Sequence, residues 1–294
     1  MKLIKQSFEI LDQQCGLEGI YKQIEISGRT CYKSEDKITD DSAKEFVDRM
    51  IKSGHGAMLE HGTVYLAIPI SEWRCTDDYR DSYISNPYSN VNDSLVNWEN
   101  NEGTVYITTN LRVLVENGWL DDLQYICEPT EYHEKRITVK FTTDQGILRE
   151  FTRHRVFSFA VESTRYCNYT KDKFSNEITF IQPNWISDED IKDYHINYNY
   201  FIDQDNNHIT AVNRFMSALK NAEYFYMELI KLGWKPQQAR NILPLATKCD
   251  MVMTGFVSDW KHFFELRDAA SAHPQAQELA HSLHETFIQR GLVE

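Results

Sequence analysis

Apolar residues recur at three- and four-residue intervals in four stretches of the chain, which predicts helices that pack one face on a core. These stretches lie at residues 42–54, 212–233, 258–267 and 274–291. Glycines at 54, 233 and 291 end three of them, as glycine commonly does after a helix. The apolar positions that define the four helices are Ala43, Phe46, Val47, Met50 and Ile51; Val212, Phe215, Met216, Leu219, Ala222, Tyr226 and Leu229; Trp260, Phe263, Phe264 and Leu266; and Leu279, Leu283 and Phe287.

Polar residues that cap helices stand before some of these stretches. Ser42 and Glu45 match the capping box, in which two side chains satisfy free N–H groups of the first turn. Ser258 is expected to cap the third helix. Asn110 is expected to cap a further short helix that runs through Val115.

Alternation of apolar and polar residues predicts strands between the helices. The predicted strands contain Val64, Leu66 and Ile68; Thr104 to Thr109; Ile137, Val139 and Phe141; Glu177 to Ile181; and Cys249, Met251 and Met253. A helix is expected from Ile147 to about Ser158, a loop from Asp81 to Asn101, and a short helix carrying Arg240 after Pro236.

Composition limits the class of protein. The chain has 294 residues, 41% of them hydrophobic, and no Pro/Gly/Ser-rich linker, which favours one globular domain. Its first ten residues lack the apolar core of a signal peptide, and no apolar run approaches the roughly 18 residues of a membrane span. Six scattered cysteines without a CxxC pair indicate reduced thiols. We therefore expect a cytoplasmic protein that does not bind a membrane.

Positive charge gathers in one short segment of an otherwise acidic chain. The formal net charge is -13, yet residues 149–173 hold six basic and three acidic residues. Arginine binds phosphate or carboxylate through two parallel N–H donors, so the segment suggests a small anionic ligand. The same arginines could instead pair with acidic surface elsewhere. The acidic balance argues against nucleic-acid binding, which needs a broad basic face.

Two histidines and a glutamate follow the first predicted helix, as His55, Glu60 and His61. Imidazole and carboxylate can hold zinc or iron, but the spacing matches neither HExxH nor HxxEH. A turn with a purely structural role and a turn that contacts a ligand are the two other interpretations.

The order of residues in the basic segment is specific. Arg153-His154-Arg155 is followed after seven residues by Ser163, with Glu162 and Arg165 beside it. This pattern resembles the signature of the flavin-dependent thymidylate synthases. Residues 55–61, 236–244 and 260–267 resemble further elements of that family, in the same order along the chain.

The resemblance implies an α+β fold with an antiparallel or mixed sheet flanked by helices, and an enzyme that methylates dUMP to dTMP. FAD would be the cofactor, with 5,10-methylenetetrahydrofolate as one-carbon donor and NADPH as reductant. The family is typically a homotetramer whose sites lie between subunits, and its partners are small molecules. In the family a short connection joins the Glu-His strand to the RHR helix, whereas 91 residues separate His61 from Arg153 here. We therefore expect an insertion at about residues 72–133.

The resemblance also implies roles for individual residues and no metal. Arg267 would stabilise charge on the pyrimidine during catalysis. Contacts to dUMP are expected from Glu150, Arg153, Glu162, Ser163, Thr164, Arg165, Arg240 and Arg267. Contacts to FAD are expected from His55, Ala57, Glu60, Arg153, His154, Arg155, Glu162, Ser258 and His262. Four positions depart from the family's usual flavin contacts: Ala57, Phe256, Ser258 and His262.

Other functions fit parts of the pattern. Ser163 could be a nucleophile, although no adjacent His or Lys is placed to activate it. A metal-dependent phosphohydrolase would use the two histidines and Glu60 with the arginines. A nucleotide- or RNA-binding module without catalysis would need only the arginines and surface aromatics.

Overall fold

The computed structural model describes residues 1–73, 83–171, 174–192 and 210–294. A four-stranded antiparallel sheet with the order β2-β6-β9-β7 forms its centre. The strands are β2 (Ser7–Ile10), β6 (Arg136–Asp144), β9 (Lys248–Phe256) and β7 (Ser158–Val161). The longest two, β6 and β9, are paired along their full length, so they form the rigid part of this sheet.

Two smaller sheets accompany the central one. Strands β3 (Thr63–Pro69), β5 (Thr104–Asn110) and β4 (Asn90–Asn92) form an antiparallel sheet in the order β3-β5-β4. Strands β1 (Lys2–Ile4) and β8 (Thr179–Ile181) pair in parallel. The predicted α+β class with antiparallel and mixed sheets is confirmed. Strand β4 lies in the stretch predicted as loop, because three residues are too few to show an alternating pattern.

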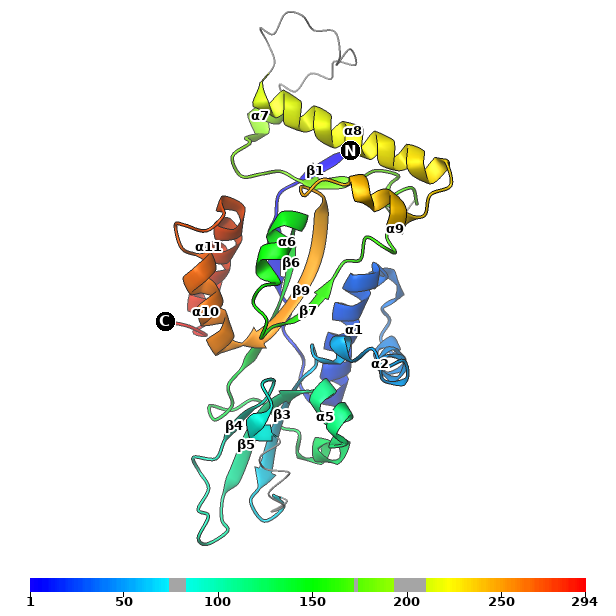
Figure 1. Cartoon of the computed structure of the whole chain (residues 1–294). Coiled ribbons are helices and arrows are strands. Elements are labelled where there is room, and N and C mark those ends of the chain that lie inside the picture. The colour runs from blue at the N-terminus through cyan, green and yellow to red at the C-terminus, as the bar shows by residue number, and fades with distance from the viewer. Residues whose placement is uncertain (74–82, 172–173, 193–209) are drawn as a thin grey trace, which may run out of the picture.

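Helices cover both faces of the central sheet (Figure 1). Helices α6 (Gln145–Phe151), α10 (Val257–Arg267) and α11 (Pro274–Gln289) pack on one face, and α1 (Gly16–Tyr32) packs on the other. The remaining helices are α2 (Ser42–Lys52), α3 (Gly56–Leu59), α5 (Leu111–Asn117), α7 (Asp188–Lys192), α8 (Ala211–Lys231) and α9 (Pro236–Ala239), with 3₁₀ turns at Glu35–Lys37, Leu120–Tyr125 and Arg240–Ile242. Within the described ranges, no helix is both long and apolar enough to cross a membrane.

The structure has two large hydrophobic cores. One lies between the central sheet and α6, α10 and α11, where Phe141, Phe151, Trp260, Phe263 and Phe287 are fully buried. The other lies between α1, α2 and the β3-β5-β4 sheet. Figure 1 shows this second sheet at one end of an elongated molecule, with α8 at the other end.

Several helix predictions are confirmed, but two caps are wrong. Asn110 caps α5, as its side chain accepts a hydrogen bond from Val113 N (3.2 Å). Ser42 instead donates its hydroxyl to Glu25 Oε2 (2.8 Å) and makes no capping box. Helix α10 begins one residue before Ser258, so this serine lies in the first turn rather than at the cap.

The helix expected from Ile147 to about Ser158 is much shorter, because the chain leaves it at Phe151 and enters β7. Pairing of β7 with β9 overrides the local helical spacing there. Arg153 therefore lies beyond the helix and does not share a helical face with Arg149.

The sequence analysis missed α1, although this helix has 17 residues. Its buried face includes Glu25 and Arg29, which form an ion pair with each other (2.9 Å), so the face does not read as apolar. Gly28 on the same face packs against the Phe46 ring, where a Cβ would lie 2.4 Å from a ring carbon. Residues 194–201 are rich in aromatic side chains, a composition that favours packing over a cofactor site, but they lie outside the described residues.

Helix α10 allows a direct test of the first core. Phe263 is 0% exposed, whereas Leu266, predicted to face the core, is 50% exposed. We expect Phe263→Ala to lower the free energy of unfolding by about 3–5 kcal/mol, because truncation leaves a cavity. Leu266→Ala on the same helix should cost about 0.5 kcal/mol or less. Urea unfolding followed by circular dichroism measures both, and equal losses would contradict this placement of the core.

Candidate functional site

Strand β7 separates the two halves of the predicted motif. Arg153, His154 and Arg155 precede it, and Glu162, Ser163, Thr164 and Arg165 follow it. Because four residues of strand span about 13 Å, the two halves lie at opposite ends of β7. The register with β9 places the first half near Thr254 and the second near Met251 and Asp250.

The first half of the motif meets the end of α10. Arg267 Nε donates to His154 Nε2 (3.0 Å), Nη1 donates to Glu150 Oε2 (2.8 Å), and Nη2 donates to the Glu150 carbonyl (2.8 Å). Three predicted residues, Glu150, His154 and Arg267, are thus brought together; we call them the Arg267 group. Helix α6 supplies Glu150, the turn after it supplies His154, and α10 supplies Arg267.

The charge state of His154 fits this geometry. Burial, with Arg267 and His262 nearby, lowers the pKa of His154 to about 4. The ring is therefore neutral near pH 7, and its Nε2 can accept a hydrogen bond from Arg267 Nε. Arg153 and Arg155 on either side are exposed, and neither makes an ion pair with any residue that the structure describes. They are available to an anionic ligand.

The second half of the motif begins with a buried carboxylate. Glu162 Oε2 accepts from Lys248 Nζ (2.8 Å) and from Asp250 N (3.0 Å), and Lys33 Nζ lies 3.6 Å away. Lys33 and Lys248 also pair with Asp250. We call Lys33, Glu162, Lys248 and Asp250 the Glu162 group. The Glu162 side chain is only 2% exposed, so these protein contacts enclose its carboxylate.

Opposite charges balance within the Glu162 group. Although burial opposes ionisation, Lys248 and Lys33 lower the pKa of Asp250 to about 2. Burial alone would lower the pKa of Lys33, but Glu162 and Asp250 together raise it well above its usual value. Lys33 and Asp250 therefore carry charge near neutral pH, and the ion pairs of the group join the end of α1 to β9 and to the end of β7.

The loop after Glu162 carries the remaining predicted substrate contacts. Ser163 N donates to the Cys31 carbonyl (3.1 Å), which fixes the loop to the end of α1. Arg240 Nη1 donates to Thr164 Oγ1 (3.2 Å), so two predicted contacts from distant segments meet here. Arg165 is exposed and its guanidinium lies over the Tyr166 ring at 5.5 Å. This loop gathers a hydroxyl-bearing turn and two guanidinium groups.

Side chains of the His55–His61 turn point to different partners. The Tyr32 hydroxyl lies 3.5 Å from His55 Nδ1, and Glu60 pairs with Arg112. His61 is fully buried, with its Nδ1 2.8 Å from Thr254 Oγ1, and burial lowers its pKa to about 3. In the described part of the chain no three His, Cys, Asp or Glu residues gather as a metal site. Ala57 is exposed on the same turn.

The last two predicted flavin contacts lie on α10. Ser258 donates both its backbone N–H (3.2 Å) and its hydroxyl to Glu134 Oε1. His262 is exposed, with its ring centre 6.4 Å from that of His154, so it borders the Arg267 group. Phe256, at the start of the helix, is buried against the Arg136 guanidinium, 5.6 Å from the ring centre.

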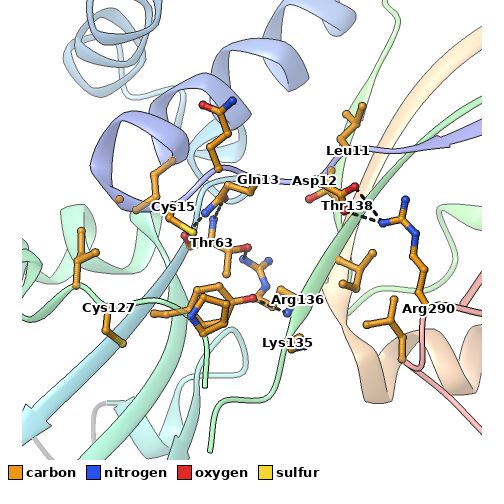
Figure 2. A pocket seen from close by; sticks show the side chains of 18 residues that line it. Leu11, Asp12, Gln13, Cys15, Thr63, Cys127, Lys135, Arg136, Thr138 and Arg290 are labelled. Atoms are coloured by element: carbon orange, nitrogen blue, oxygen red, sulfur yellow. Dashed lines mark hydrogen bonds and ion pairs between the residues drawn. The ribbon is translucent and has the colours of Figure 1, made fainter. Parts of the chain in front are cut away.

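Of two cavities in the described structure, one borders the Glu162 group and the other lies apart from both groups. One of about 290 Å³ is lined by Glu162, Lys248 and Tyr169 among others, and so borders the Glu162 group. Another of about 320 Å³ lies between the chain before α1, β3, the start of β6 and the C-terminal segment with Arg290 (Figure 2). None of the predicted site residues lines this second cavity.

The sequence analysis missed several residues that hold the site. They are Lys33, Arg112, Glu134, Lys248 and Asp250. Lys248 and Asp250 could have been found, because they are charged residues at alternate positions of an otherwise apolar strand. No local signal marks the other three, whose partners are distant in sequence.

Known proteins resemble this chain mainly over its second half. A family model described as thymidylate synthase complementing protein matches residues 129–290, more than half of the chain. A probable flavin-dependent thymidylate synthase of Paramecium bursaria Chlorella virus 1 is 26% identical over 152 residues, which are 52% of this chain and 66% of that protein. The flavin-dependent thymidylate synthase of Haloarcula marismortui is 26% identical over 177 residues, 53% of this chain and 64% of that protein.

Among solved structures, a UMP/dUMP methylase, PolB from Streptomyces cacaoi, aligns with a TM-score of 0.43 and 16% identity, over 98% of this chain and 93% of that one. The match to the curated relatives spans slightly less than two thirds of their length. Three of the four resembling segments, 149–169, 236–244 and 260–267, fall inside the region that the family model matches. The chain therefore belongs to the family of the thymidylate synthase complementing protein, the flavin-dependent thymidylate synthases.

Proposed function

We propose that this protein is an FAD-dependent thymidylate synthase that methylates dUMP to dTMP. Its family membership supports this activity, and so does the chemistry of its relatives as their names state it. The observation that carries the proposal is the Arg267 group, in which Glu150 and a neutral His154 orient one guanidinium beside two exposed arginines. A fixed donor beside free cations suits an anionic nucleotide whose ring gains negative charge.

The residues around His154 fit FAD. Arg153 and Arg155 are exposed, in a chain with a net charge of -13, and offer donors for its two phosphates. His55, Ala57 and His262 are also exposed and available for contact. When bound, FAD would supply the hydride, with NADPH as its reductant and 5,10-methylenetetrahydrofolate as the one-carbon donor.

We propose that the loop of Ser163, Thr164 and Arg165, with Arg240, seats the dUMP phosphate. Its backbone N–H groups, hydroxyls and guanidinium groups are the donors that phosphate prefers. Arg267 would meet the pyrimidine. Its guanidinium has five N–H donors and uses three in the contacts above, so two remain to stabilise charge on the ring.

We propose that the active sites form between subunits of a homotetramer. Within one chain, β7 separates the Arg267 group from the loop of Ser163, Thr164 and Arg165. One small nucleotide can therefore contact both kinds of group more easily when they come from two different chains. Exposed apolar side chains on α8 and the segment after it support such an interface. They are Tyr224, Phe225, Leu232, Trp234 and Leu245. The reduced thiols of Cys15, Cys31, Cys127, Cys167 and Cys249 fit a cytoplasmic location.

We also propose that the family's domain spans residues 1–294 with an insertion at about residues 72–133. Strands β4 and β5 and helix α5 lie within these bounds. Strand β5 pairs with β3, the strand before the insertion, over its whole length, which supports an insertion that extends the sheet of β3.

The cofactor gives the first test of this function. The purified protein should be yellow or take up FAD, and NADPH should bleach the flavin absorbance under anaerobic conditions, faster when dUMP is present. Stopped-flow absorbance measures both. A protein that stays colourless at high FAD concentration would refute the assignment.

Arg267 and Arg165 should have separable effects. A donor aimed at developing charge is worth about 3 kcal/mol, roughly a hundredfold in rate. Arg267→Ala should therefore slow methylation at saturating dUMP by about that factor. Arg165→Ala should mainly raise the dUMP concentration required, because it removes a phosphate contact. Single-turnover assays on both variants separate the effect on rate from the effect on dUMP affinity. An unchanged maximal rate for Arg267→Ala would show that Arg267 takes no part in the chemical step.

Shared sites predict complementation between inactive chains. A site that takes Arg267 from one subunit and the phosphate loop from another is intact in some mixed oligomers of Arg267→Ala and Arg165→Ala. We expect activity at low dUMP after the two variants are unfolded together and refolded, but not when they are refolded separately. If mixing restores nothing although mixed oligomers form, each site belongs to a single chain.

A further inference from the structure

A separate lobe of the molecule contacts two of the residues that the family resemblance implies for FAD binding. It contains β3, β4, β5 and α5, together with the return segment to Lys135, and we call it the excursion. In Figure 1 it extends away from the central sheet, beside α1 and α2. Its contacts reach Glu60 on the His55–His61 turn and Ser258 at the start of α10.

The contact to Glu60 comes from Arg112 on α5. Arg112 Nη1 pairs with Glu60 Oε1, and its Nε donates to Glu116 Oε1 on the same helix (2.7 Å). The Glu60 side chain is only 11% exposed, whereas that of Glu116 is 55% exposed. A buried carboxylate without a cation is costly, so Arg112 is the partner that lets Glu60 stay in place.

The backbone of the same turn is held by the excursion and by the residue after it. Leu111 N donates to the Gly62 carbonyl (3.0 Å), and Arg136 Nη1 donates to the Glu60 carbonyl (3.1 Å). A Cβ on Gly56 would lie 2.9 Å from Arg112 Nε, so the start of the turn rests directly on this arginine. The position of the turn is thereby fixed at both ends by groups outside it.

The contact to Ser258 comes from Glu134 on the return segment. Its Oε1 accepts from the backbone N–H and hydroxyl of Ser258, and its Oε2 accepts from Asn90 Nδ2 on β4 (2.9 Å). Asn92 on β4 also donates to the Tyr132 carbonyl (3.0 Å), which keeps the return segment beside this strand. A carboxylate at the N-terminus of α10 is also favoured by the helix dipole.

We propose that the excursion is a positioning unit for the FAD site, in which Arg112 orients Glu60 and Glu134 orients Ser258. The inference rests on the proposed function, since these two residues matter only if they meet the cofactor. It extends that function by assigning positioning residues to a segment that lies almost wholly before the region matching the family model. Neither Arg112 nor Glu134 needs to touch FAD itself.

FAD titration of the protein freed of cofactor tests the proposal. Arg112→Gln and Glu134→Gln should each raise the Kd for FAD about tenfold, the factor expected when one hydrogen bond to a charged group is lost. Arg112→Lys keeps the charge and should recover most of the affinity. Glu116→Gln is the matched control, because it removes the exposed partner of Arg112 and leaves Glu60 paired. Flavin fluorescence measures all four.

Thermal unfolding of the same FAD-free variants separates positioning from general support of the fold. We expect a smaller FAD-induced rise of the unfolding midpoint for Arg112→Gln and Glu134→Gln than for wild type. This difference is measured on top of the lower FAD-free midpoint that loss of the buried Glu60 pair causes in Arg112→Gln. A lower midpoint with unchanged Kd would make both residues structural and overturn the inference. If wild type binds FAD and both variants bind it equally well, the inference fails while the proposed function stands. If wild type binds no FAD, the proposed function fails first and the inference falls with it.

Discussion

The pairing of β7 with β9 is the constraint on which the rest of the site depends. Four residues, Ser158–Val161, are paired with Met251–Thr254 in the middle of β9. That register sets the RHR turn at one end of β7, beside the end of α10, and the loop of Ser163, Thr164 and Arg165 at the other end, beside α1. Because the side chains of a strand alternate between faces, a one-residue slip would turn Ala160 outward and disrupt both ends at once.

Buried charge then fixes each end. At one end Arg267 is held by Glu150 and by a histidine that burial keeps neutral. At the other, two lysines face Glu162 and Asp250 in a compact group with little exposure to water. Such ion pairs add little net stability, because moving charged side chains out of water is costly. Removing one partner of a pair, however, leaves an unpaired buried charge. Their role is to fix positions, which a site built from distant segments requires.

Local signals predicted the elements with regular patterns. The strands around Val139 and Met251, the helices of residues 211–231 and 274–289, and the cap at Asn110 all follow from periodicity and capping chemistry. Local signals failed in α1, where polar residues face inward. They also failed in β4 and β7, because these strands are too short to show an alternating pattern and are stabilised by pairing with a neighbouring strand. In α1 the buried pair of Glu25 and Arg29 interrupts the apolar face and so weakens the hydrophobic pattern of the helix.

The sequence by itself determined which chemical groups this protein has and their order along the chain, because the RHR turn, the Glu-Ser-Thr-Arg loop and the Arg240 and Arg267 elements are continuous motifs. Only the tertiary structure decided which of them meet. It joined Arg267 to Glu150 and His154, joined Arg240 to Thr164, and turned Glu162 inward toward Lys33 and Lys248. The physical reason is that ion pairs form through space between residues that are distant in the sequence, such as Lys33 and Asp250. Such pairs leave no periodic pattern of apolar and polar residues.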